Sequence, residues 1–378
     1  MNLLNLLQMA FPPLRHKLLA CPRGMRKLSA AIDGGAGKFI DLGKEAPFYC
    51  PPGIALNVQF FTSFESSGID NYVAILEHGK VYSECGFVLV GDSDSLYLIE
   101  ELSVSRRYDT TWNDHRFMAV FKHQVFHPVI KHSGSVAVLT TTAADNNYYH
   151  FLLEAAPRVE LLRRAGISPD WYYIAAEHCY QREVLQTLGI PLEKVIQPSN
   201  HIALQADTLI VPAPCFYCTM DCGVSDFSEH GLNFIATAFT VGVPDGGRKR
   251  LYIRRGNART RSVVNEAQSA DMITREFGFS CITPDEMTVK EQAAAFYQAE
   301  LVVGMHGAGL SNLVFCRPGT VVIELFAGNS MALYYNVLAA KRRLKYYYAI
   351  LPAVDEINLY LEPAVLAQLI SKALSEVK

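Results

Sequence analysis

The amino-acid sequence predicts an α/β protein with two units, each built on a parallel sheet covered by helices, behind a β-rich N-terminal section. Three observations predict this class. Apolar runs of strand length alternate with helical segments from residue 135 onward, a polar break at 244–247 divides that alternation, and residues 37–132 contain short strand-like runs. Two sheets of this kind in one chain imply a cleft between them.

The composition is that of a globular chain without a strong overall charge. Its 378 residues are 50% hydrophobic and 19% charged, with a formal net charge of −3 and a pI near 6.4. This balance excludes the basic surface that gathers nucleic acid, so no nucleic-acid partner is predicted. The nine cysteines are scattered and odd in number, and no secretory signal precedes them. We therefore expect reduced thiols and a cytoplasmic location.

Residues 1–27 combine an apolar start with a basic cluster. Pro12 and Pro13 end the apolar run well short of the roughly 20 residues that a membrane span requires. An apolar segment beside cations can lie on an anionic membrane surface, which predicts peripheral contact at the inner face of the membrane. A frayed or packed first helix is the alternative.

The section 1–134 is predicted to be rich in β-strands, separated by Gly, Asp and Ser turns. Asp92-Ser93-Asp94 matches an Asp-x-Asp metal-binding pattern, but it lies between two apolar runs, as a hairpin turn does. No metal is therefore assigned to it. Strands are expected at 54–58, 72–76, 86–90 and 96–99.

The unit 135–244 contains a helix with a polar stripe. Strands are expected at 136–140, 171–174, 195–196 and 208–211, and helices at 148–165 and 182–188. Within the first helix, which contains Pro157, the residues His150, Glu154 and Arg158 are spaced at i, i+4 and i+8. They therefore share one face of an otherwise apolar helix. Because this helix follows a strand, its start is expected to face the cleft.

The unit 248–350 repeats the alternation and is followed by a helical tail at 351–378. Strands are expected at 250–254, 300–303 and 320–323, and helices at 265–277 and 289–299. Gly304, Gly307 and Gly309 lie between a buried strand and the next helix, where free amides and the helix dipole make a seat for a phosphate or diphosphate. About twenty residues on, Glu324 is placed to hold the hydroxyls of a ribose. Together these features predict a nucleotide site.

Seven cations and no carboxylate occupy residues 248–261. Arg254 and Arg255 fall at the end of a strand, and Arg259 and Arg261 lie in the turn that leads to the next helix. Several guanidinium groups can therefore converge on the carboxyl edge of the sheet, where they pair bidentately with phosphate oxygens. A solvated basic turn is the simpler alternative.

Three ordered motifs within residues 135–350 resemble glycosyltransferase family 61. They are 252–261 with Asn265 and Glu266, 303–312 with Ile323 and Glu324, and 147–154. The resemblance implies a GT-B architecture, in which two Rossmann-like domains face each other across a cleft. It also implies inverting transfer of a sugar from a nucleotide-diphosphate donor, with uridine-diphosphate (UDP) sugars expected, to a hydroxyl of a glycan or lipid-linked acceptor. It implies no obligatory cofactor or metal.

Roles follow as expectations. His150 is the expected catalytic base, with Asp145 and Glu154 as alternatives, because an imidazole titrates near neutrality. A structural histidine bonded to Glu154 is the competing interpretation. The expected donor-binding residues are Arg254, Arg255, Arg259, Asn265, Glu266, His306, Gly307, Ala308, Gly309, Ser311, Asn312 and Glu324.

Two other functions stay open from the sequence. One is a polysaccharide-modifying transferase of another kind, such as a pyruvyl transferase, which would keep the glycine turn but not the arginine motif. The other is a non-catalytic nucleotide- or glycan-binding relative. The sequence does not indicate the sugar, the acceptor, the linkage or the oligomeric state.

Overall fold

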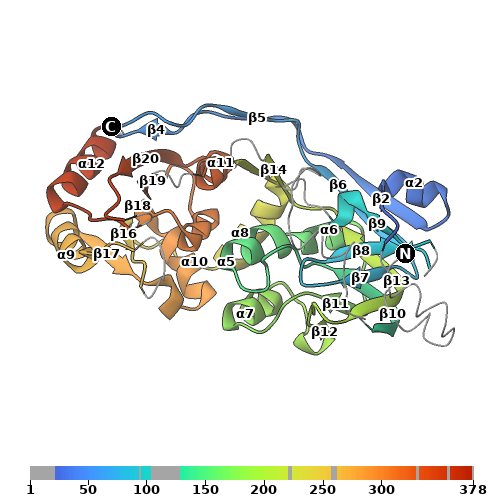
Figure 1. Ribbon diagram of the computed structural model, residues 1–378. Helices are drawn as coiled ribbons and strands as arrows, with labels where there is room; N and C mark the ends of the chain where they lie inside the picture. The colour runs from blue at the N-terminus through green and yellow to red at the C-terminus, as the bar shows by residue number, and fades with distance from the viewer. Residues whose placement is uncertain are drawn as a thin grey trace. The chain divides into compact units, whose positions relative to one another are not determined.

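The computed structural model describes residues 22–92, 95–103, 128–219, 224–256, 262–328, 332–355 and 358–376. The chain forms two compact units (Figure 1). The first comprises Met1–Glu45 and Gly68–Met220, and the second comprises Ala46–Ser67 and Asp221–Lys378. Both are α/β, as predicted. The expected Arg259 and most of the expected membrane-contacting segment 1–27 lie outside the described residues.

The first unit is built on one mixed sheet. Its main path runs β1-β9-β8-β7-β13-β10-β11-β12, and β6 pairs with both β13 and β2. The strands β13, β10, β11 and β12 are parallel, whereas β6, β7 and β8 pair antiparallel with their neighbours. The strands are β1 Met25–Arg26, β2 Gly37–Lys44, β6 Asp70–Glu77, β7 Lys80–Tyr82, β8 Phe87–Val90, β9 Tyr97–Ile99, β10 Val129–Val138, β11 Trp171–Tyr173, β12 Val195–Ile196 and β13 Ala203–Pro212, with β14 Phe216–Thr219 outside this sheet.

The predicted boundary at 134 does not separate two folding units, because it falls inside β10. The long strand β13 joins the N-terminal strands to the parallel ones. Its first half pairs with β7 and its second half with β6, while its other edge pairs with β10. The apolar side chains also form one core, in which Leu76 and Val88 pack with Val136 and Leu209. The β-rich section is therefore part of the first sheet.

The helix predicted at 148–165 is divided into three parts. α5 (Tyr148–His150) is followed by a π-helical turn, η2 (Phe151–Ala155), and then by α6 (Arg158–Arg164). Pro157 explains the division, since it has no amide hydrogen and its ring clashes with the carbonyl four residues earlier, so the turn widens. The other helices of this unit are α2 Leu28–Asp33, α3 Glu100–Ser103, α7 Cys179–Thr187 and η3 Leu192–Lys194.

The second unit is built on a six-stranded sheet whose order is β17-β16-β18-β19-β20-β4. All neighbours in it are parallel. The strands are β16 Lys249–Ile253, β17 Phe279–Ile282, β18 Ala299–Met305, β19 Val321–Ala327, β20 Lys345–Leu351 and β4 Ile54–Ala55, with β3 Phe48–Cys50, β5 Phe64–Ser66 and β15 Val224–Phe227 outside the sheet.

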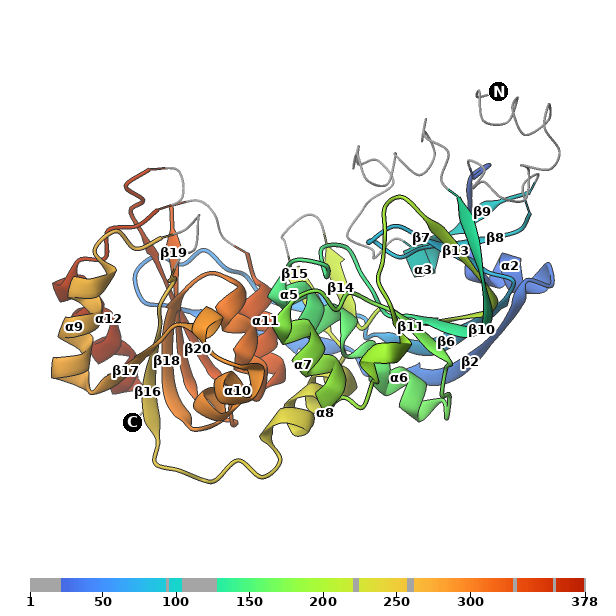
Figure 2. The same cartoon turned by 90° about the horizontal axis from the view of Figure 1, so that it is seen from below.

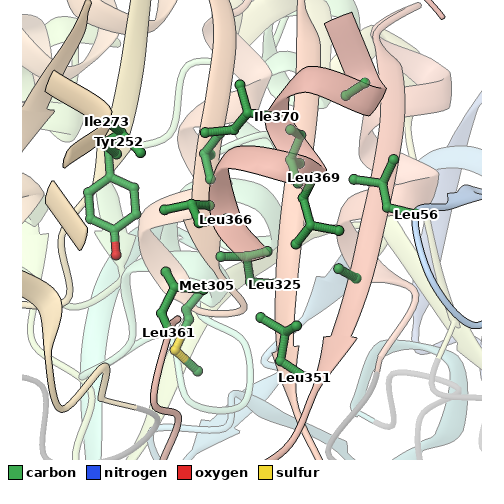
Figure 3. Packing of buried hydrophobic residues seen from close by; sticks show 14 of the residues in the cluster. Leu56, Tyr252, Ile273, Met305, Leu325, Leu351, Leu361, Leu366, Leu369 and Ile370 are labelled. Atoms are coloured by element: carbon green, nitrogen blue, oxygen red, sulfur yellow. The ribbon is translucent and has the colours of Figure 1, made fainter. Parts of the chain in front are cut away.

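Helices cover both faces of this sheet. α9 (Glu266–Phe277) and α12 (Pro363–Glu376) lie on one side, and α10 (Val289–Tyr297) and α11 (Tyr334–Lys341) lie on the other (Figure 2). Under α9 and α12, side chains from both helices and from the strands form the core, among them Ile273, Leu325, Leu366 and Ile370 (Figure 3). The predicted tail 351–378 is thus an integral layer of this unit.

The polar break at 244–247 lies within the second unit instead of between the two. α8 (Glu229–Thr240) precedes the break and packs with the helices that follow it, since the ring of Phe239 lies 5.5 Å from that of Phe315. Phe315 ends the 3₁₀-helix η5 (Ala308–Phe315), and a second short 3₁₀-helix, η4, spans Pro284–Glu286. The unit boundary therefore lies earlier, near residue 221.

The segment 46–67 belongs to the second unit, although we expected its strand in the N-terminal section. β4 adds to the edge of β20, and Phe61 is buried against the rings of Phe326 and Tyr348 at 5.6 and 4.5 Å. The amides of Phe60 and Phe61 both donate to the Tyr348 hydroxyl.

In the part of the chain that the structure describes, no helix is both long and apolar enough to cross a bilayer.

Candidate functional site

The strand order of the second unit identifies one place where a ligand is expected. If β16 is counted as the first strand and β4 is set aside, the order of the five strands is 2-1-3-4-5. The direction in which successive strands are added to the sheet therefore reverses between β16 and β18. In open parallel sheets of this order, ligands bind at the carboxyl ends of the strands beside that reversal. Ile253 pairs with Gly304 there, so Arg254 and the glycine turn emerge side by side.

The glycine turn presents backbone amides. β18 ends at Met305, and the 3₁₀-helix η5 begins at Ala308. The carbonyl of Gly307 accepts hydrogen bonds from the Tyr335 hydroxyl at 2.7 Å and from the Leu310 amide at 3.0 Å, which fixes that peptide plane. Because the carbonyl and the amide of a peptide point in opposite directions, the Ala308 N–H is directed away from Tyr335. Free amides at a helix start are able to seat an anion, and the helix that begins here is a 3₁₀-helix.

Arg255 lies against this turn. A Cβ atom built on Gly307 would come within 1.9 Å of Arg255 Nη1, so only glycine lets the guanidinium lie there. Glu266, the first residue of α9, accepts a hydrogen bond from the Arg255 amide at 3.0 Å. We expected Glu266 to contact the donor. The structure instead shows it holding the backbone that carries the arginines.

Arg254 has a buried donor without a partner. Its amide donates to the Ile282 carbonyl at 2.8 Å, which anchors the backbone to β17. Its side-chain Nε is buried and has no hydrogen-bond partner among the described residues. A buried cationic N–H without an acceptor is unfavourable, so an anion at this position would be stabilised.

Three of the expected donor-binding side chains are engaged within the fold. Asn265 donates to the Leu361 carbonyl and accepts from the Leu361 amide, both at 2.9 Å. Asn312 donates to Gln292 Oε1 at 2.7 Å, and the Ser311 hydroxyl lies 3.5 Å from that of Tyr335. Ser311 and Asn312 are fully buried. Asn265 therefore anchors the segment that leads into α12, and Ser311 and Asn312 anchor η5.

The structure does not support the expected ribose contact of Glu324. We expected the strand to end there, but β19 continues to Ala327, so Glu324 lies mid-strand and its side chain points onto the sheet face. It is fully buried, and one of its oxygens lies 2.5 Å from His306 Nδ1. The other accepts from the Tyr346 hydroxyl. Both carboxylate oxygens are thus hydrogen-bonded to buried side chains of the fold.

The first unit places its polar stripe at the carboxyl edge of its own sheet. Asn147 caps α5 by accepting from the Tyr149 amide at 2.9 Å. His150 Nδ1 lies 2.8 Å from Glu154 Oε2, and both side chains are buried. Arg158 donates to the carbonyls of Thr140 and Pro212, which stand at the ends of β10 and β13. Burial lowers the pKa of Arg158 to about 10.

The His150–Glu154 pair is incomplete on one side. Glu154 Oε1 is buried, and no partner for it is found within the ranges that the structure describes. Asp145, the alternative base, lies in the preceding turn, where its backbone carbonyl accepts from Gln181 Nε2 at 2.8 Å. The carboxylate of Asp145 makes no hydrogen bond to the pair in the described structure. The geometry therefore favours His150 and Glu154 over Asp145.

Two tyrosines that were not among the expected site residues support the site of the second unit. Tyr335 fixes the glycine turn from α11, and Tyr346 holds Glu324 from β20. The alternation along 345–351 places Tyr346 on the same face of the strand as Tyr348, and this pattern could have indicated Tyr346. Within the described ranges, no group of three or more His, Cys, Asp or Glu side chains could hold a metal ion.

Comparison with known proteins relates part of this chain to glycosyltransferases. Residues 148–323 match the model of the family Glycosyltransferase 61. A beta-1,2-xylosyltransferase, RCN11, of Oryza sativa subsp. japonica is 35% identical over 66 residues, which cover 18% of this chain and 12% of that protein. A protein O-linked-mannose beta-1,4-N-acetylglucosaminyltransferase 2 of Tetraodon nigroviridis is 31% identical over 104 residues, covering 26% and 17%.

A beta-1,2-xylosyltransferase of Arabidopsis thaliana is 30% identical over 61 residues, covering 16% of this chain and 11% of that protein. The matched stretches thus span less than a fifth of each relative. The family match runs from α5, which carries His150, through the arginine motif and the glycine turn to β19. Through residues 148–323, this chain is thus similar to the glycosyltransferase 61 family.

Proposed function

We propose that this protein is an inverting glycosyltransferase that moves a sugar from a nucleotide-diphosphate donor, in the first place a UDP-sugar, to a hydroxyl acceptor. The observation that carries the proposal is that Arg254, Arg255 and the Gly307–Gly309 turn meet between β16 and β18, where the order of strand addition in the second unit reverses. Two guanidinium groups and a row of amides suit a diphosphate. The family's relatives, named as xylosyl- and N-acetylglucosaminyltransferases, support the sugar transfer.

In this reaction the acceptor oxygen forms a bond to the anomeric carbon as the bond from that carbon to the diphosphate oxygen breaks. The hydroxyl proton passes to a base, and the diphosphate leaves with the bonding electron pair. Negative charge therefore grows on the leaving diphosphate. Arg254, Arg255 and the turn amides are the groups we assign to stabilise that charge, because preorganised donors act most strongly where charge develops.

We assign the base to His150. Glu154 holds Nδ1 at 2.8 Å, which orients the ring and stabilises the imidazolium that forms when Nε2 takes the proton. A positioned base contributes on the order of 10² to 10⁴ in rate. We expect a GT-B arrangement of the two units, a glycan or lipid-linked acceptor and action in the cytoplasm. Six cysteines of the described ranges are free, namely Cys50, Cys85, Cys179, Cys215, Cys281 and Cys316, and reduced thiols suit that compartment.

The function is tested by incubating the full chain with a panel of nucleotide sugars and acceptors and measuring nucleoside-diphosphate release. Arg254→Ala should lose donor binding and turnover together, whereas His150→Ala should bind UDP normally and lose turnover. Arg250→Ala is the matched control, because that arginine lies earlier in β16 and pairs with Glu300 of the neighbouring strand β18, away from the turn. Absence of turnover with every donor, or full turnover in Arg254→Ala, would contradict the proposal. Transfer of a pyruvyl group would instead identify a pyruvyl transferase. Binding of a nucleotide or glycan without turnover would identify a non-catalytic relative.

A further inference from the structure

We propose that Glu324 and Tyr346 are positioning residues that hold His306 with its Nδ1 protonated, so that Nε2 serves the diphosphate of the donor. This inference rests on the proposed function. Neither Tyr346 nor Glu324 would contact the ligand, because both side chains are buried in the sheet beneath the glycine turn. The residue that contacts the donor is His306, which directly precedes Gly307 in the glycine turn.

The hydrogen bonds define where the protons lie. Burial and the neighbouring Glu324 raise the pKa of Tyr346 well above its ordinary value, so its phenol keeps its proton and donates to Glu324. Glu324 is therefore an acceptor at that oxygen. Its second oxygen lies 2.5 Å from His306 Nδ1, and a buried carboxylate is stabilised when both oxygens accept from donors. The proton of this contact thus belongs on Nδ1.

The His306 ring is also held by aromatic contacts. It stacks on Phe326, with centroids 5.2 Å apart and planes 25° apart, and the Tyr335 ring lies 5.5 Å away. Its side chain keeps 9% exposure, and no hydrogen bond to Nε2 is found among the residues that the structure places. Fixing of one ring nitrogen by a carboxylate determines what the other can do, which makes Nε2 the functional atom.

The carboxylate of Glu324 also compensates positive charge on the ring. When an anionic diphosphate binds beside the turn, Nε2 takes up a proton from the solvent, so an Nε2–H bond forms as an O–H bond of hydronium breaks. The imidazolium then donates to a phosphate oxygen while Glu324 balances its charge. The contact strengthens as the leaving group gains charge, so His306 should affect the rate as well as donor binding.

Substitution of His306 by an amide side chain distinguishes the role of Nδ1 from that of Nε2. An asparagine at 306 places its N–H near the Nδ1 position and can still donate to Glu324, whereas a glutamine places its N–H near the Nε2 position. We expect His306→Asn to keep the thermal midpoint of the parent and to lose at least about tenfold in UDP affinity, as measured by calorimetry. His306→Gln should keep more of the affinity and lose thermal stability.

The positioning residues are tested by nitrogen NMR of the ¹⁵N-histidine-labelled full chain. In the parent we expect the His306 signals of an Nδ1–H ring, with the Nε2 signal moving when UDP is added. Tyr346→Phe and Glu324→Gln should weaken that Nδ1–H signature and lower kcat more than they raise the KM for the donor. A purely structural role would change the stability but leave the Nε2 signal insensitive to UDP.

The outcomes distinguish this inference from the function on which it rests. If the parent binds UDP, Arg254→Ala abolishes binding and His306→Asn binds like the parent, the inference is wrong and the function stands. Equal losses of affinity in His306→Asn and His306→Gln would also overturn it. If the parent binds no nucleoside diphosphate at all, both proposals are wrong.

Discussion

The packing of Arg255 on Gly307 gives the sharpest prediction. In Gly307→Ala the new methyl carbon would stand 1.9 Å from Arg255 Nη1 and 2.9 Å from Cζ, against at least 3.4 Å for an ordinary contact. The guanidinium must therefore retreat by roughly 1.5 Å. The backbone at Gly307 is extended, with φ 167° and ψ 170°, so alanine itself is tolerated there.

A displacement of that size is enough to break a hydrogen bond between the guanidinium and a phosphate oxygen. Hydrogen bonds to charged groups contribute about 1.5 to 3 kcal/mol. That range corresponds to a loss of roughly 10- to 150-fold in UDP affinity. The folding free energy should change by no more than about 1 kcal/mol, because the displaced atoms are the end of a flexible side chain.

The assay is calorimetric titration of UDP into the full chain, with thermal unfolding measured on the same samples. Gly247→Ala is the matched control, since a Cβ there meets no atom within 4 Å. If Gly307→Ala binds UDP as tightly as Gly247→Ala does, Arg255 does not contact the donor. Arg254 would then be the arginine that binds the diphosphate. A large loss of thermal stability would instead show that the turn itself has been disrupted.

Three further predictions concern folding. Lys341 and Asp226 form a buried ion pair at 2.9 Å, with side-chain exposures of 4% and 0%. Lys341→Met should lower the free energy of unfolding, measured in urea, by about 3 to 5 kcal/mol, because it leaves the Asp226 charge buried and uncompensated. Lys345→Met, at an exposed position, is the control. Leu366→Ala, in the core between α9, α12 and the sheet, should cost about 2 to 5 kcal/mol by the same measurement, and a smaller loss would mean that the helix layer collapses onto the cavity. The pKa of Asp170 in the folded protein is lowered chiefly by the hydrogen bond from the Ser135 amide. The ionised carboxylate therefore stabilises the fold at pH values above its pKa in the unfolded chain, about 3.9, and this stabilisation is lost as the pH falls through the lower pKa of the folded state. Asp170→Asn should therefore show a shallower acid loss of the thermal midpoint than the parent, and identical pH profiles would refute this.

Local patterns predicted the parts of the site that local chemistry makes. The strand, glycine turn and helix at residues 299–315, and the arginines at the end of β16, were placed correctly because periodicity and glycine chemistry act over a few residues. The role of Glu324 was not predictable in this way. It depends on how far β19 continues and on Tyr346 from the neighbouring strand, which are long-range pairings.

The division of the chain was misjudged for the same reason. The N-terminal strands join the first sheet through β13, more than a hundred residues later, and β4 joins the second sheet at β20. Nothing near residues 54–55 or 70–77 signals those partners. The π-helical turn before Pro157 was missed as well, although the proline was noticed, because the sequence shows that a helix is perturbed there but not how it relaxes.

Each unit has one buried histidine–glutamate pair at its candidate site, and the two pairs differ in a way that bears on their chemistry. In the second unit both oxygens of Glu324 accept hydrogen bonds from groups of the fold, which suits a fixed positioning role. In the first unit Glu154 Oε1 is buried without a partner in the described structure, which leaves a strong acceptor unsatisfied. The two carboxylates therefore differ in how completely they are hydrogen-bonded within the described structure. Hydrogen bonding, more than residue type, thus supports assigning the base to His150 and donor contact to His306.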